Sequence, residues 1–143
     1  MLNIERFYFI IDNNIGTIVL IGLASTSGLA LLYLSLQNLG AKASPLQATQ
    51  MINRGKHLIL DVRNGEQFAS GHMRDAKNIA LADLTARLGE LSKFKQHPVI
   101  VVCQNGSISS KATKLLQQAG FDHAVSLEGG LTAWQAAGLP VIK

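Results

Sequence analysis

The chain has 143 residues, of which 48% are hydrophobic and only 6% are aromatic, which suits one modest domain and a further segment. Its 13 Lys and Arg residues outnumber its 9 Asp and Glu residues, for a formal net charge of +4. The cations are scattered along the sequence, so the composition carries no signature of nucleic-acid binding. A single cysteine excludes an intramolecular disulfide.

The apolar excess is concentrated near the N-terminus. No charged residue occurs from Asn13 to Ala41, and residues 15–36 (IGTIVLIGLASTSGLALLYLSL) are nearly all apolar or small. As a helix this run would be about 33 Å long, enough to cross a hydrocarbon core of about 30 Å. We therefore predict an N-terminal flank at 1–14, a transmembrane helix at 15–36, a linker at 37–44 and a soluble domain at 45–143.

Two other interpretations of this segment stay open. A signal peptide cleaved near 41–44 (AKAS) would release the domain into the periplasm. Against it, the apolar run exceeds the usual core of about 7–15 residues, and Glu5 and Asp12 outnumber the single Arg6 before it. The other interpretation is a buried core helix, although a small soluble domain rarely needs one of that length. If the segment is a membrane anchor, the cations Lys42 and Arg54 on its C-terminal side favour a domain in the cytoplasm.

Short apolar runs and amphipathic segments alternate after residue 44. The runs of strand length are 57–62 (HLILDV), 77–80 (KNIA), 98–103 (PVIVVC) and 123–127 (HAVSL). The segments with helical spacing or caps are 45–53, 66–70, 82–91, 109–119 and 129–138. Continuous apolar strands alternating with helices predict a three-layer α/β/α domain with a four- or five-stranded parallel sheet.

Two helix starts are specified by capping residues. Ser44, Pro45 and Gln47 form the pattern of a capping box with proline in the first turn. Asp83 is expected to cap the helix predicted at 82–91.

The only cysteine, Cys103, lies at the end of the clearest strand and before a loop rich in small residues (CQNGSISS). Ligands of open α/β sheets bind at the carboxyl ends of the strands. The following helix directs its unpaired N–H groups toward this loop, which favours an anion and lowers a thiol pKa. A nucleophilic role is therefore predicted for Cys103. A buried structural cysteine is the alternative, since cysteine is also a common small core residue.

Three ordered stretches resemble the rhodanese-like domain family of sulfurtransferases. They are LILDVRNGEQFASGHMRDAKNIA (58–80), VIVVCQNGSISS (99–110) and GFDHAVSLEGGLTAWQAAGLPV (120–141). The resemblance covers roughly residues 46–142, and it implies that Cys103 accepts a sulfane sulfur as a persulfide and passes it to a thiol. The backbone of the loop, with Gln104, Asn105, Gly106, Ser107, Ile108 and Ser109, would hold the persulfide or a bound anion. Membrane-anchored members of this family occur in bacteria, which implies the bacterial inner membrane as the location.

The loop departs from the family pattern at one position. Ile108 stands where an arginine is often found, and no cation occurs between Cys103 and Lys111. We therefore expect weak binding of dianionic thiosulfate and favour a persulfide as the sulfur donor. Related cysteine-dependent phosphatases need a longer loop ending in arginine, so phosphatase activity is not expected.

Other family positions have structural interpretations. Asp61 and Arg63 match a family motif and are expected to support the cleft through hydrogen bonds rather than to act directly. His72 is expected to pack under a loop, Trp134 to lie in the core, and the Gly129–Gly130 pair to allow a tight turn. The histidines have no metal-ligand spacing, and the sequence predicts neither a metal nor a cofactor.

Three functions remain possible from the sequence. The leading hypothesis is a membrane-anchored sulfurtransferase whose partners are a sulfur donor, a thiol acceptor and the membrane. The second is a rhodanese-like module, weak or inactive as an enzyme, that docks a membrane or cytosolic protein; Ile108 is the feature that favours it. The third is a redox sensor that oxidises at Cys103.

Overall fold

The computed structural model describes residues 27–32 and 41–143. Residues 27–32 are helical, and they are the only described part of the transmembrane helix predicted at 15–36. Among the residues described, no helix has the length and apolar character needed to cross a membrane. The rest of the predicted span lies outside the described residues, so the anchor stays a prediction. Residues 41–143 belong to a separate compact unit.

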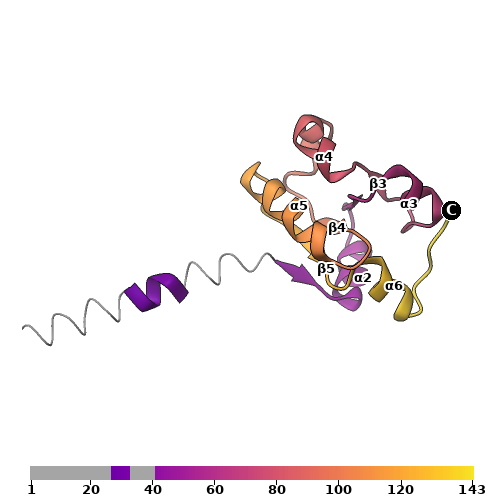
Figure 1. The fold of residues 1–143 in the computed structure, drawn as a ribbon, viewed down its shortest axis with the longest axis horizontal. Helices are drawn as coiled ribbons and strands as arrows, with labels where there is room; N and C mark the ends of the chain where they lie inside the picture. The colour runs from indigo at the N-terminus through magenta and orange to yellow at the C-terminus, as the bar shows by residue number, and fades with distance from the viewer. Residues whose placement is uncertain (1–26, 33–40) are drawn as a thin grey trace, which may run out of the picture. The chain divides into compact units, whose positions relative to one another are not determined.

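This unit is built on a five-stranded parallel sheet (Figure 1). From edge to edge, the strands are β1 (Lys42–Ala43), β5 (Ala124–Leu127), β4 (Val99–Val102), β2 (Leu58–Asp61) and β3 (Lys77–Asn78). The central strand β4 pairs along its length with β2, where Leu58 lies opposite Val99. All residues of β2 and β4 are buried, which explains why β4 and the first three residues of β2 appear in the sequence as unbroken apolar runs.

The first strand, β1, was not predicted. Lys42 and Ala43 lie in the stretch expected to be a linker, yet Lys42 pairs with Ser126 and Ala43 pairs with Leu127. The sheet therefore begins before residue 45, the expected start of the domain. A strand of two residues is too short to show an alternating pattern, and so the sequence carried no signal for it.

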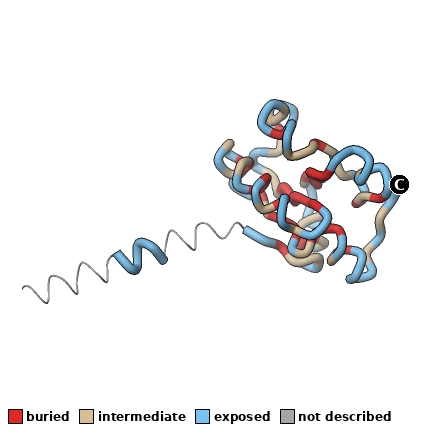
Figure 2. Tube along the Cα trace, in the orientation of Figure 1, coloured by how far each residue is buried: buried red, intermediate tan, exposed pale blue. Residues whose placement is uncertain are grey.

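Helices cover both faces of the sheet, as predicted for a three-layer domain. They are α2 (Pro45–Asn53), α3 (Gly65–Ser70), α4 (Leu81–Leu84), the 3₁₀ helix η1 (Thr85–Phe94), α5 (Ser107–Gln118) and α6 (Gly130–Ala136). Ala48 of α2 and Trp134 of α6 pack with Ile100 in one core cluster. Leu91 of η1 and Leu116 of α5 pack with the opposite face of the sheet in the other. Figure 2 shows buried stretches along the strands and, interspersed with exposed ones, in the helices; α3 has no buried residue.

The start of α2 confirms the predicted capping box. The Ser44 hydroxyl accepts a hydrogen bond from the Gln47 backbone N–H at 3.3 Å, and the Gln47 side chain accepts from the Ser44 N–H at 2.9 Å. Both bonds satisfy N–H groups that a helix end otherwise leaves unpaired.

The predicted helix at 82–91 is wrong in type. Only Leu81–Leu84 is α-helical, the N-cap residue is Ala80, and Asp83 lies inside the first turn and does not cap the helix. Residues 85–94 form a 3₁₀ helix. Leu88, Leu91 and Phe94 are spaced by three, which places them on one side of a helix with three residues per turn, and all three pack against the core.

Candidate active site

Cys103 follows the central strand β4 and is buried, with 1% of its surface exposed. The turn after it is shorter than predicted, because α5 begins at Ser107 rather than at Ser109. Gly106, with φ of 93°, occupies the N-cap position, and the Asn105 side chain accepts a hydrogen bond from the Ser107 N–H at 3.2 Å. Three residues assigned to the loop from sequence, Ser107, Ile108 and Ser109, therefore form the first turn of α5.

The sulfur of Cys103 lies among hydrogen-bond donors. The Gly106 N–H donates to Sγ at 3.0 Å, and the Ser109 hydroxyl oxygen lies 3.4 Å from Sγ. Burial alone raises the pKa of this thiol, but the Ser109 hydroxyl and nearby backbone N–H groups lower it by more. The net pKa of Cys103 is below the ordinary thiol value, so the thiolate is populated at lower pH than for a free cysteine.

Two glycines let the start of α6 approach the cysteine loop closely. Gly129 and Gly130 have φ of 70° and 60°, which confirms the predicted tight turn. A Cβ atom on Gly130 would lie 2.7 Å from the Asn105 nitrogen, closer than real Cβ contacts come. This approach allows the Leu131 N–H to donate to the Cys103 carbonyl oxygen at 2.8 Å. The loop is thus fixed from β4, α5 and α6 together.

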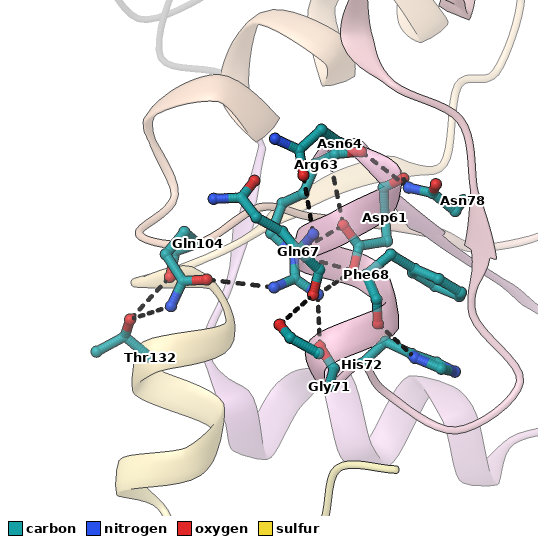
Figure 3. Close-up of polar contacts among 11 residues, drawn as sticks. Asp61, Arg63, Asn64, Gln67, Phe68, Gly71, His72, Asn78, Gln104 and Thr132 are labelled. Carbon is teal, nitrogen blue, oxygen red and sulfur yellow. Dashed lines mark hydrogen bonds and ion pairs between the residues drawn. The ribbon is translucent and has the colours of Figure 1, made fainter. Parts of the chain in front are cut away.

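A buried ion pair supports the loop from the side of β2 (Figure 3). Arg63 and Asp61 form a salt bridge of 2.7 Å, and both side chains are almost fully buried. The Arg63 guanidinium also donates to the Gly71 carbonyl at 2.7 Å and to the Gln104 side chain at 3.2 Å. The pair therefore joins the end of β2, the end of α3 and the loop after Cys103. These contacts agree with a supporting role, and in the described part of the chain the hydrogen bonds of the sulfur go to Gly106 and Ser109 rather than to this pair.

The other predicted loop residues are mostly turned away from the sulfur. The Gln104 side chain is held between Arg63 and Thr132, where its Nε2 donates to the Thr132 hydroxyl at 3.2 Å (Figure 3). The Asn105 side chain binds Ser107. Ile108 has 44% of its surface exposed. The contact between the loop and the sulfur is thus made by backbone N–H groups and by Ser109.

His72 and Trp134 lie apart from the cysteine, in packing positions. The His72 ring stacks on Phe68 with 3.8 Å between ring centroids, and its Nδ1 lies 2.8 Å from the Phe68 carbonyl (Figure 3). The Trp134 indole donates to the Pro140 carbonyl at 3.0 Å and packs in the core.

Two polar residues near the loop were not predicted, namely Ser126 and Thr132. Thr132 donates to the Gln104 carbonyl at 2.9 Å. Ser126 lies 2.7 Å from Ser109, oxygen to oxygen, and is 1% exposed. The signal for Ser126 was present in the sequence, because it is a polar residue inside a strand that is otherwise apolar. In the described part of the chain, no group of three or more His, Cys, Asp or Glu side chains could hold a metal ion.

The geometry suits transfer of a soft, anionic group. A thiolate at Cys103 is a nucleophile held by N–H donors, and the same donors can stabilise a negative charge one atom further out.

Comparisons with known proteins give one consistent result. A family profile described as a rhodanese-like domain matches residues 44–137. The chain is 33% identical over 98 residues to the thiosulfate sulfurtransferase GlpE of Actinobacillus pleuropneumoniae, a match that covers 68% of this chain and 89% of that protein. It is 32% identical over 98 residues to the uncharacterized protein YibN of Escherichia coli, covering 68% of each.

A solved structure supports the same assignment. The solution structure of a rhodanese-like domain from an Anabaena protein superposes with a TM-score of 0.64 at 30% sequence identity, over 73% of this chain and 80% of that one.

Proposed function

The chain belongs to the rhodanese-like domain family of sulfurtransferases, and we propose that it carries sulfane sulfur as a persulfide on Cys103. The observation that carries this proposal is the buried thiol itself. Its Sγ accepts the Gly106 N–H at 3.0 Å, and its pKa is lowered by hydrogen bonds despite the burial that opposes this. A purely structural cysteine in an apolar core would have a raised pKa instead.

The proposed reaction has two displacement steps. In the first, the Cys103 thiolate attacks the sulfane sulfur of the donor, a new S–S bond forms, and the donor leaves with the electron pair of its broken bond to that sulfur. The leaving group is sulfite from thiosulfate, or a thiolate from a persulfide. In the second, an acceptor thiolate attacks the outer sulfur and Cys103 leaves as a thiolate. The two steps consume no external oxidant or reductant.

Backbone N–H groups are expected to stabilise the negative charge of the persulfide intermediate. Its terminal sulfur is anionic, and the N–H groups of Gly106 and the first turn of α5 are the nearest donors. Donors fixed before the reaction stabilise such a charge without reorganisation.

Labelled sulfane sulfur tests this step. The full chain is incubated with a low-molecular-weight persulfide whose outer sulfur is radioactive, and is then separated from the donor. We expect the label to stay with the protein and to be released by a reducing thiol. A folded protein that retains no label would favour the docking module instead.

The preferred donor follows from the charge of the loop. Residues 104–110 contain no cation, and Ile108 is exposed at the first turn of α5. The loop itself offers a dianionic donor no counter-charge, and the nearby Lys42 shares its cavity with the anionic Glu128. A persulfide carries less charge to neutralise. The relative from Actinobacillus is named a thiosulfate sulfurtransferase, so thiosulfate is the reference donor to compare.

Replacing Ile108 with arginine is expected to raise kcat/KM for thiosulfate about ten- to a hundredfold, the value of one charge-assisted hydrogen bond. The value for a neutral trisulfide donor should change little. Steady-state rates with both donors measure this selectivity. Ile108→Gln is the matched control, because it adds a polar side chain without charge. Equal gains for both donors would contradict the electrostatic account.

A docking module is the second candidate function. The feature that favours it is the same uncharged loop with an exposed apolar residue at position 108, which gives a protein partner more to contact than a small anion. In that case the label described above would not be retained, although the fold would be intact.

We also propose that residues 15–36 anchor the protein in a bacterial inner membrane with the rhodanese-like domain in the cytoplasm. The support is the uncharged apolar run from Asn13 to Ala41, its length, and the excess of cations after it.

A thiol placed on the surface tests this orientation. The reporter is a thiol away from the proposed sulfur carrier, namely Lys114→Cys in a Cys103→Ser background, at an exposed position of α5. A membrane-impermeant maleimide is expected to label inverted vesicles and to spare right-side-out vesicles until detergent is added. Labelling of intact right-side-out vesicles would place the domain in the periplasm. Recovery of the thiol in the soluble fraction would instead indicate signal cleavage.

A further inference from the structure

Two serine hydroxyls lie buried behind the sulfur of Cys103. Ser109, in the first turn of α5, has no exposed surface, and Ser126, in β5, is 1% exposed. Their oxygens are 2.7 Å apart, so they share a hydrogen bond in which either atom can be the donor. The Ser109 hydroxyl contacts the sulfur directly, whereas Ser126 has no part in the proposed transfer reaction.

The hydrogen bonds around the pair limit where its two protons can lie. The Ser109 oxygen lies 3.4 Å from Sγ and 3.1 Å from the Gly106 carbonyl oxygen, which can only accept. Among the residues that the structure describes, the Ser126 hydroxyl has no hydrogen-bond partner except Ser109. A buried hydroxyl proton without an acceptor is costly. Ser126 therefore donates to the Ser109 oxygen.

This direction leaves the Ser109 proton free for other acceptors. With the thiol, Cys103 S–H donates to the Ser109 oxygen, and Ser109 donates to the Gly106 carbonyl. With the thiolate, the sulfur becomes the stronger, charged acceptor, and the Ser109 proton turns toward it. Ser126 continues to donate in both states. A hydroxyl that accepts a hydrogen bond is also a better donor, because the chain of bonds is polarised.

We propose that Ser126 is a positioning residue of the active site: by donating to the Ser109 oxygen, it directs the Ser109 hydroxyl proton at the Cys103 sulfur. The inference rests on the proposed function only in that it takes this sulfur to be the working atom. Ser126 does not touch the sulfur and acts through Ser109 alone.

Charged groups lie near the pair on two sides, because Lys42 pairs with Ser126 between β1 and β5 and Arg63 lies beyond the Gln104 side chain. Arg63 and Asp61 are paired with each other and reach the loop only through the Gln104 side chain. Lys42 and Glu128 line a cavity of about 300 Å³ that Ser126 and Gly106 also border.

The proposal predicts that the pKa of Cys103 depends on Ser126. Because the chain has no other cysteine, alkylation of the protein measures Cys103 alone. The full chain, purified in mild detergent, is alkylated with iodoacetamide across a pH series. Ser126 donates in both states, so Ser126→Ala removes only the polarisation that strengthens the Ser109 bond to the thiolate. We expect it to weaken the ionisation of Cys103 about two- to threefold and so to move the alkylation midpoint to higher pH. Ser126→Thr retains a hydroxyl and should restore the midpoint.

Ser110→Ala is the matched control. The Ser110 hydroxyl also donates to the Gly106 carbonyl at 3.1 Å, but among the described residues it has no hydrogen bond to the Ser109 hydroxyl or to the sulfur, so the midpoint should stay in place. A Ser109→Ala background supplies the second test, since Ser126→Ala should then have no further effect on the midpoint. This comparison remains valid if Ser126→Ala also loosens β5, because a general loosening would act in either background.

An unchanged or lower midpoint in Ser126→Ala would overturn the proposal, and a lower one would show that Ser109 donates to Ser126 instead. A shift of equal size in the Ser109→Ala background would also overturn it. The alkylation midpoints are measured on Cys103 without a bound sulfur, so they need no sulfur donor. A chain that never accepts labelled sulfur would refute the proposed function while leaving this result intact.

Discussion

Replacing Cys103 with serine is expected to reduce sulfur transfer to the uncatalysed background. The thiolate is the nucleophile in the proposed first step, and a serine hydroxyl remains protonated in the same environment. The fold should survive, since the hydroxyl is smaller than the thiol and can accept the Gly106 N–H that now binds Sγ. The readout is the rate of transfer from a low-molecular-weight persulfide to an acceptor thiol, with the unfolding midpoint measured alongside.

Ser110→Ala is the control for changes in the loop that leave the nucleophile in place, and it should retain most of the activity. Transfer by the Cys103→Ser variant at a rate close to that of the unaltered chain would mean that the sulfur is never carried on this residue. A docking module predicts that partner binding survives in the same variant.

Replacing Arg63 with methionine is expected to cost about 3–5 kcal/mol of unfolding free energy, because it leaves a carboxylate buried without its partner. Asp61 is 1% exposed, and the salt bridge of 2.7 Å is its ionic contact. The same change frees the Gly71 carbonyl and the Gln104 side chain, so it also loosens the loop after Cys103. Urea denaturation at neutral pH measures the loss.

Two variants show whether burial causes this cost. Arg87→Met breaks an exposed pair with Glu90 and should change the unfolding free energy little. Adding Asp61→Asn to Arg63→Met removes the unpaired charge and should recover part of the stability. If Arg63→Met were no more destabilising than Arg87→Met, the buried pair would not support the site.

The position of the cysteine was predictable because strong local signals agree there. The apolar run ending at Cys103 and the helical spacing after it place the thiol at the end of a buried strand, and the structure has both elements. The capping box at Ser44 was predictable for a similar reason, since it depends on residues three apart in the chain. Such features are specified by neighbours in sequence.

The features that could not be predicted depend on contacts between distant segments. β1 exists because Lys42 and Ala43 pair with β5, more than eighty residues later. The 3₁₀ form of η1 follows from how Leu88, Leu91 and Phe94 meet the core, which their spacing alone did not distinguish from an α-helix. The role of Ser126 depends on its distance from Ser109 across the sheet and α5. Sulfur transfer was predicted from the resemblance to a family. The local sequence pattern alone predicted only a cysteine in a loop suited to binding an anion.

The most direct measurement is the intact mass of the full chain before and after exposure to sulfur donors. The chain is treated with a low-molecular-weight persulfide, and separately with thiosulfate, and each sample is split and reduced with a thiol. The account predicts a gain of one sulfur atom from the persulfide, a smaller extent of the same gain from thiosulfate, removal by the reducing thiol, and no gain in Cys103→Ser. No gain from either donor, with Cys103 intact and the protein folded, would contradict it.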